Sequence, residues 1–190
     1  MRRFHQALLI ITFLALSWLA MMVVHEAGHV AGAVCTGATV EKLVLHPLAI
    51  SRTDVGNNQR PLVVIWAGPI LGTLLPLVML CFFRQAKWSC RPLVRFFAGF
   101  CLLANGGYIG FGSFERIGDA GDLLNHGSPT WMLWLFGVVT IPIGFWLWNG
   151  LGPAFGLGAA KGEVNHRLAY LSAGLLALTV LAELCLSPSH

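Results

Sequence analysis

The sequence predicts an all-α polytopic membrane protein with about five transmembrane helices and a short β-hairpin after the first helix. Of its 190 residues, 56% are hydrophobic and 11% are charged, whereas soluble domains carry about 25% charged residues. The apolar residues form long runs, close to the roughly 20 residues that a helix needs to cross a bilayer. One polar segment after the first run instead contains β-branched residues with partial alternation, a pattern typical of strands.

The expected elements follow one another in a simple order. The first span covers residues 7–37, and a hairpin with a turn at His46-Pro47 follows within residues 39–55. The Gly-Asn-Asn-Gln stretch at 56–59 predicts a loop. The second span is interrupted by Gly68-Pro69 and Pro76, and a polar loop follows the third span. The four later spans are expected at residues 61–83, 92–112, 131–148 and 168–186.

The chain length predicts one membrane-embedded domain over residues 1–190. Its core is expected at about 7–125, with accessory helices at about 130–187. The net charge of +4 does not indicate a nucleic-acid partner, because the basic residues are dispersed at the ends of spans. They fit the positive-inside rule, with eight on the side of the N-terminus and four on the other. We therefore expect a multi-pass protein with a cytoplasmic N-terminus. The eight are Arg2, Arg3, Arg84, Lys87, Arg91, Arg95, Lys161 and Arg167, and the four are Lys42, Arg52, Arg60 and Arg116.

Residues 25–29 of the first span read His-Glu-Ala-Gly-His. Ionisable side chains within an apolar span are costly and indicate function. Residues four apart share one face of a helix, so His25 and His29 can bind one metal ion. Glu26 then lies beside the remaining coordination positions and can take a proton from a water there. The alternative is a chance match, or two core histidines hydrogen-bonded to neighbouring helices.

A catalytic zinc site needs a third protein ligand, which can be a carboxylate. The expected topology places the end of the first span, the hairpin and the loop after the third span on the same side of the membrane. Asp119 and Asp122 are three residues apart in that loop. One is expected to be a ligand, and the other a helix cap or a hydrogen-bond partner of a ligand histidine. The full set of candidates is Glu115, Asp119, Asp122, His126, His46 and Asp54.

Three motifs together resemble the site-two protease family of intramembrane zinc metalloproteases. They are the His-Glu-Ala-Gly-His sequence at 25–29, Ala-Gly-Pro at 67–69 and Gly-Asp-Ala at 118–120. The resemblance implies Zn²⁺ bound by His25, His29 and Asp119, with Asp122 as the alternative third ligand. It covers roughly residues 20–125. The chain departs from many relatives by having Gly72 where they have Asn after the Ala-Gly-Pro element, and by lacking a Leu-Asp-Gly motif.

The implied activity is hydrolysis of peptide bonds in transmembrane or membrane-proximal segments of a protein or peptide substrate within the lipid bilayer. Glu26 would be the general base, and a strand edge of the hairpin would hold the unwound substrate. Asn105, Gly68 and Pro69 are candidate substrate-binding residues, with ordinary helix packing as their alternative role. Two other functions stay open. One is a non-catalytic relative that binds membrane partners, and the other is a small metal transporter.

Overall fold

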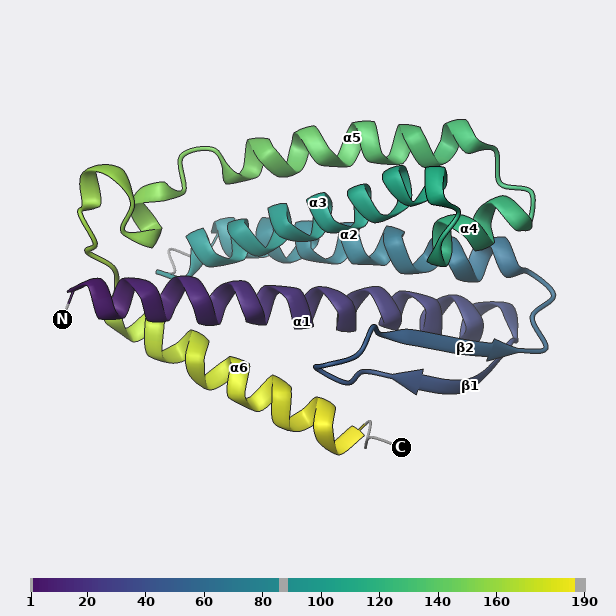
Figure 1. Cartoon of the computed structure of the whole chain (residues 1–190), viewed down its shortest axis with the longest axis horizontal. Helices are drawn as coiled ribbons and strands as arrows, with labels where there is room; N and C mark the ends of the chain where they lie inside the picture. Colours follow the sequence, from purple (N-terminus) through teal and green to yellow (C-terminus); the bar gives the residue numbers. More distant parts are fainter. Residues whose placement is uncertain (1, 86–88, 187–190) are drawn as a thin grey trace.

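The computed structural model describes residues 2–85 and 89–186 (Figure 1). Within these residues, five helices are long and apolar enough to cross a membrane, and a two-stranded antiparallel hairpin follows the first of them. The predicted fold class is thereby confirmed. The elements are α1 (Arg2–Thr36), β1 (Thr39–Val44), β2 (Arg52–Gly56), α2 (Pro61–Gln85), α3 (Arg91–Glu115), α4 (Gly118–Asn125), α5 (Thr130–Trp148), η1 (Gly152–Phe155), η2 (Gly158–Ala160) and α6 (His166–Leu186).

Helix α1 is the central element, and its 35 residues give a length of roughly 50 Å. It therefore extends beyond the roughly 30 Å hydrocarbon core of a bilayer. The helix ends at Gly37, whose φ of +73° is accessible to glycine at little cost. The Gly37 N–H donates to the Val34 carbonyl, and the Ala38 N–H donates to the Ala33 carbonyl. This pair of bonds is the Schellman ending, and it turns the chain back into the hairpin.

The other long helices pack in sequence around α1. Helix α2 lies along α1, α3 along α2 and α5 along α3, whereas α6 crosses α1 on its other side (Figure 1). The contact between α3 and α5 uses small residues: a Cβ at Gly106 would lie 2.1 Å from Thr140 Oγ1. Thr12 Oγ1 and Ser172 Oγ lie 2.6 Å apart where α6 crosses the N-terminal half of α1. The far half of α6 diverges from α1 (Figure 1).

The hairpin folds back beside the C-terminal half of α1 (Figure 1). Strands β1 and β2 form the predicted hairpin and pair antiparallel, with Leu43 opposite Thr53. The connection between the strands carries Leu48 and Ile50, whose side chains are 91% and 90% exposed. Because the connection lies alongside a transmembrane helix, these two apolar side chains are suited to contact lipid.

Two segments differ from the prediction. Helix α2 runs without a break through Pro69 and Pro76, because membrane helices tolerate proline where neighbouring groups satisfy the freed carbonyls. Within this helix the buried Thr73 hydroxyl donates to the Pro69 carbonyl, four residues earlier. The predicted polar loop after the third span contains the eight-residue helix α4, which buries Ala120 and Leu123 against other helices.

Candidate metal centre

The two histidines of the motif face the interior from the C-terminal third of α1. His25 and His29 are each 7% exposed, and their Nε2 atoms lie 3.0 Å apart. Their one-turn spacing places both rings on the same face of the helix. The helix alone therefore supplies two nitrogen ligands that point to one position.

Helix α4 brings a carboxylate to the same position. Arg116 and Gly118, both at positive φ, form the turn that separates α4 from α3. Ala120 and Leu123 on its buried face pack with Ile109 of α3 in one hydrophobic cluster, which holds α4 against the bundle.

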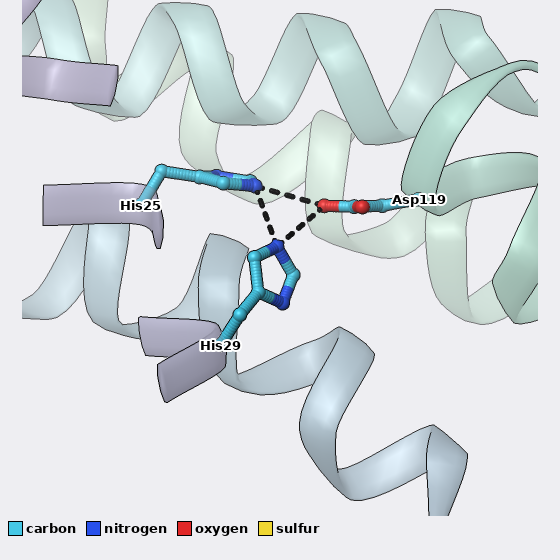
Figure 2. Close-up of side chains that lie close together, drawn as sticks. All are labelled: His25, His29 and Asp119. Atoms are coloured by element: carbon cyan, nitrogen blue, oxygen red, sulfur yellow. Dashed lines mark hydrogen bonds and ion pairs between the residues drawn. The ribbon is translucent and has the colours of Figure 1, made fainter. Parts of the chain in front are cut away.

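Asp119 lies in the first turn of α4 and completes a triangle with the two rings. Its Oδ2 is 2.8 Å from His25 Nε2 and 3.1 Å from His29 Nε2, as Figure 2 shows. No other group of three or more His, Cys, Asp or Glu residues with metal-ligand spacing is found among the residues that the structure describes. The cluster joins two elements about 90 residues apart in sequence.

The other ring nitrogen of each histidine has an acceptor partner. His25 Nδ1 lies 2.6 Å from Asn105 Oδ1, and His29 Nδ1 lies 3.0 Å from the Val64 carbonyl oxygen. The Asn105 orientation is consistent, because its Nδ2 donates to the Cys101 carbonyl. Both Nδ1 atoms must therefore carry hydrogen and donate. In neutral rings this leaves the Nε2 lone pairs directed at the triangle, the tautomer that a metal ligand requires.

The triangle fits a zinc ion. Two Nε2 lone pairs and a carboxylate oxygen are three acceptors in contact, and they repel unless positive charge lies among them. The separations of 2.8, 3.0 and 3.1 Å are close to the roughly 3.3 Å between ligands of a tetrahedral zinc ion with bonds of about 2.0–2.1 Å. Two nitrogens and one oxygen also form a common ligand set of catalytic zinc, which leaves a fourth position open.

The charge state of Asp119 suits this role. Burial by itself would raise the pKa of its carboxyl group, but N–H groups and positive charge on the two rings, when they are protonated with no metal ion bound, outweigh burial. The pKa of Asp119 consequently lies well below its usual range. The side chain is an anion at neutral pH, as a carboxylate ligand must be.

Glu26 lies next to the first histidine and is 4% exposed. Its Oε1 accepts a hydrogen bond of 2.8 Å from Ser51 Oγ, and its Oε2 accepts one of 2.7 Å from Thr53 Oγ1. Both donors belong to the hairpin, at and just before β2. The buried carboxylate is thus paired on both oxygens, which compensates for its removal from water.

The structure does not place the other candidate ligands with the histidines. Asp122 is exposed although it shares α4 with Asp119, and it belongs to no metal-spaced group among the described residues. Asp54 pairs with Arg52 at 3.3 Å. His126 bonds the Asp122 carbonyl. Glu115 is exposed, and His46 lies in the hairpin connection. Of the six carboxylate and histidine candidates, only Asp119 contacts the ring nitrogens.

The Ala-Gly-Pro element of α2 makes room for the site. A Cβ at Gly68 would lie 2.4 Å from the His29 ring, and one at Gly28 would lie 2.3 Å from the Ala67 carbonyl oxygen. Gly72, the departure noted above, provides space in the same way, because its Cβ would meet the Asn105 amide at 2.8 Å. These glycines let α1, α2 and α3 approach closely enough to hold both histidines.

Four contributors to the site have no motif signal in the sequence. They are the Val64 carbonyl, the hydroxyls of Ser51 and Thr53, and the Tyr108 hydroxyl, which accepts the Asp119 N–H at 3.0 Å. A backbone carbonyl is present at every residue, so no pattern identifies Val64. The hydroxyls at 51 and 53 have the two-residue spacing of one strand face, but that spacing alone does not connect them to Glu26.

Comparison with known proteins identifies the family of the chain. Residues 5–106, more than half of the chain, match the family model described as Peptidase M50B-like. The matched region contains nearly all of α1, the hairpin, α2 and most of α3, and it ends before Asp119. No curated protein and no solved structure matches the chain.

Proposed function

Because the chain belongs to the Peptidase M50B-like family, the site-two protease family that its three motifs resemble, we propose that it is an intramembrane zinc metalloprotease. Its substrates would be transmembrane proteins or peptides, cut within or next to their membrane segments. The chain would act as one domain, with a catalytic core at about 7–125 and accessory helices at about 130–187. The observation that carries this proposal is the triangle of His25 Nε2, His29 Nε2 and Asp119 Oδ2 beside the buried Glu26.

In this proposal His25, His29 and Asp119 hold the zinc ion. Zinc in such a site acidifies water and polarises a carbonyl group. Asn105 and Val64 keep both rings in the Nδ1–H form, so that the Nε2 atoms stay available. The short ring-to-acceptor contacts also fix the ring planes, which pre-organises the ligands.

Glu26 performs the proton transfers. It would accept a proton from the attacking water and deliver it to the nitrogen of the leaving amine. Because it adjoins His25 in the helix, it would lie near the metal, and its burial would keep bulk water from competing for the proton. Substrate binding by Asn105, Gly68 and Pro69, and pairing of an unwound substrate with the free edge of the hairpin, remain predictions.

The test compares zinc content and cleavage in detergent-purified protein. Wild type and Glu26→Gln should both contain close to one zinc per chain, whereas His25→Ala, His29→Ala and Asp119→Ala should lose it. Asp122→Ala is the matched control on α4 and should retain zinc. Glu26→Gln should lose cleavage of labelled single-span membrane peptides by at least about 100-fold, because the general base is removed.

The results separate the three candidate functions. Zinc without cleavage of any membrane peptide would favour the non-catalytic relative. Zinc uptake into proteoliposomes, abolished by His25→Ala, would favour the transporter. Retention of zinc in Asp119→Ala and its loss in Asp122→Ala would assign the third ligand to Asp122 and contradict the proposed site.

A further inference from the structure

The carboxylate of Glu26 is held by an element other than its own helix. Ser51 Oγ donates to one carboxylate oxygen at 2.8 Å, and Thr53 Oγ1 donates to the other at 2.7 Å. The donors follow Glu26 by 25 and 27 residues in sequence. The hairpin is thus bonded directly to the side chain beside the metal triangle.

The two donors form a geometric pair. Side chains two residues apart point to the same face of an extended strand, and Thr53 lies within β2 with Leu43 opposite it on β1. The terminal torsion of a glutamate is broad, so the carboxylate ordinarily rotates with little restraint. One donor on each oxygen removes that freedom. Each oxygen still has an acceptor position for a water molecule.

We propose that Ser51 and Thr53 are positioning residues for the general base, and that the hairpin must stay docked against α1 during turnover. The inference rests on the proposed function, in which Glu26 transfers the proton. The hairpin then has two roles in one element: it lies where an unwound substrate would be bound, and it sets the orientation of the base that acts on that substrate. Loss of either hydroxyl frees the carboxylate to rotate away from the reacting water.

The contrasting role for these hydroxyls is purely structural, namely satisfying a buried charge. Both roles predict that the hydroxyls hold the hairpin to α1. Only the positioning role predicts a fall in kcat at constant KM and constant zinc content, and its recovery when a hydroxyl of a different residue type is restored. The experiment therefore measures docking and turnover separately.

Docking is measured first, by hydrogen exchange of zinc-loaded protein without substrate. Ser51→Ala combined with Thr53→Val should speed exchange of the amides at 52–56 by about tenfold, the effect of losing charge-assisted hydrogen bonds. Glu26→Ala should give the same increase, because it removes the shared acceptor. Thr12→Val with Ser172→Ala is the matched control, since it deletes a hydroxyl pair between α1 and α6. Unchanged exchange in the hairpin variants would overturn the proposal.

Turnover is measured on whichever labelled single-span membrane peptide wild type cleaves fastest. Thr53→Val and Ser51→Ala should each lower kcat on the order of tenfold with little change in KM, as expected when a reacting group is misoriented. Thr53→Ser and Ser51→Thr should restore most of the rate. An unchanged kcat, or a rise in KM alone, would show that the hydroxyls do not position the base.

Failure of the proposed function is distinguishable from failure of this inference. If wild type holds zinc and cleaves none of the peptides, the protease assignment fails whatever the variants do. The exchange data alone then decide whether Glu26 holds the hairpin against α1. Faster exchange in both the hydroxyl and Glu26→Ala variants supports this docking, and unchanged exchange overturns it. If wild type cleaves and the hydroxyl variants cleave equally well, the protease assignment stands and the positioning role fails.

Discussion

Asn105 and Val64 determine which nitrogen of each histidine faces the metal triangle. The Nδ1–H of His25 donates to Asn105 at 2.6 Å, and the Nδ1–H of His29 donates to the Val64 carbonyl at 3.0 Å. The Nε2 lone pairs therefore stay available to a metal ion. Outer hydrogen bonds of this kind also raise the basicity of the ring. Asn105 is 1% exposed, so its amide holds the His25 ring inside the bundle, away from bulk solvent.

Replacing Asn105 with alanine should therefore weaken zinc binding by about 10- to 100-fold. The His25 ring would lose the acceptor that fixes its tautomer and plane. The measurement is competition with a zinc chelator of known affinity. Cys101→Ala is the control, because it removes volume one turn earlier on the buried face of α3 without touching the ring. Equal affinity in Asn105→Ala and wild type would contradict the orienting role.

At the scale of elements, the site depends on how α4 is set against α3. Arg116 and Gly118 at positive φ turn the chain after α3. The buried Ala120 and Leu123 then pack α4 against the bundle. The Tyr108 hydroxyl then accepts the Asp119 N–H, a donor that the first turn of a helix leaves without an intrahelical partner. Together these contacts hold Asp119, the proposed third ligand, against the two rings.

The variant Tyr108→Phe tests the last of these contacts. It should lower zinc affinity by roughly fivefold, since one such hydrogen bond contributes about 1 kcal/mol, and it should speed amide exchange at the start of α4. The protein contains two tyrosines, so Tyr170→Phe, which alters a contact with His5 at the opposite end of α1, is a matched control. A larger effect from Tyr170→Phe would indicate a global change and not the loss of this contact.

At the scale of the whole molecule, the charges divide between the two ends of the bundle. Arg2, Arg3, Arg91 and Arg167 belong to the first turns of α1, α3 and α6, which lie at the end of the bundle near the N-terminus (Figure 1). The hairpin and α4 lie toward the other end. By the positive-inside rule, we expect the metal triangle to lie nearer the outer face.

Topology mapping tests this orientation. In intact spheroplasts, a short epitope tag before residue 2 should be protected from an added antibody, and a tag after residue 186 should be accessible to it. The two tags differ because an odd number of spans puts the termini on opposite sides of the membrane. Permeabilised cells serve as the control, in which both tags should react. An accessible N-terminal tag with a protected C-terminal tag would reverse the orientation and place the triangle toward the cytoplasm.

Much of this arrangement can be read from local sequence because it depends on short-range physics. Long apolar runs specify membrane helices, and Gly37 ends α1. The four-residue spacing of His25 and His29 by itself places both side chains on one face of a helix. The strand pattern at 39–55 likewise predicts the hairpin. Each of these features depends on residues a few positions apart, so the sequence alone is enough to predict it.

The sequence by itself determined the membrane fold, the paired histidines and the adjacent Glu26, and it narrowed the third ligand to a few candidates. Only the tertiary structure brought Asp119, and not Asp122, to the rings, because that choice depends on the turn at Arg116 and on which face of α4 is buried. It alone joined Val64 to His29 and the hairpin hydroxyls to Glu26. Contacts between distant elements depend on how helices pack, and no spacing along the chain encodes them.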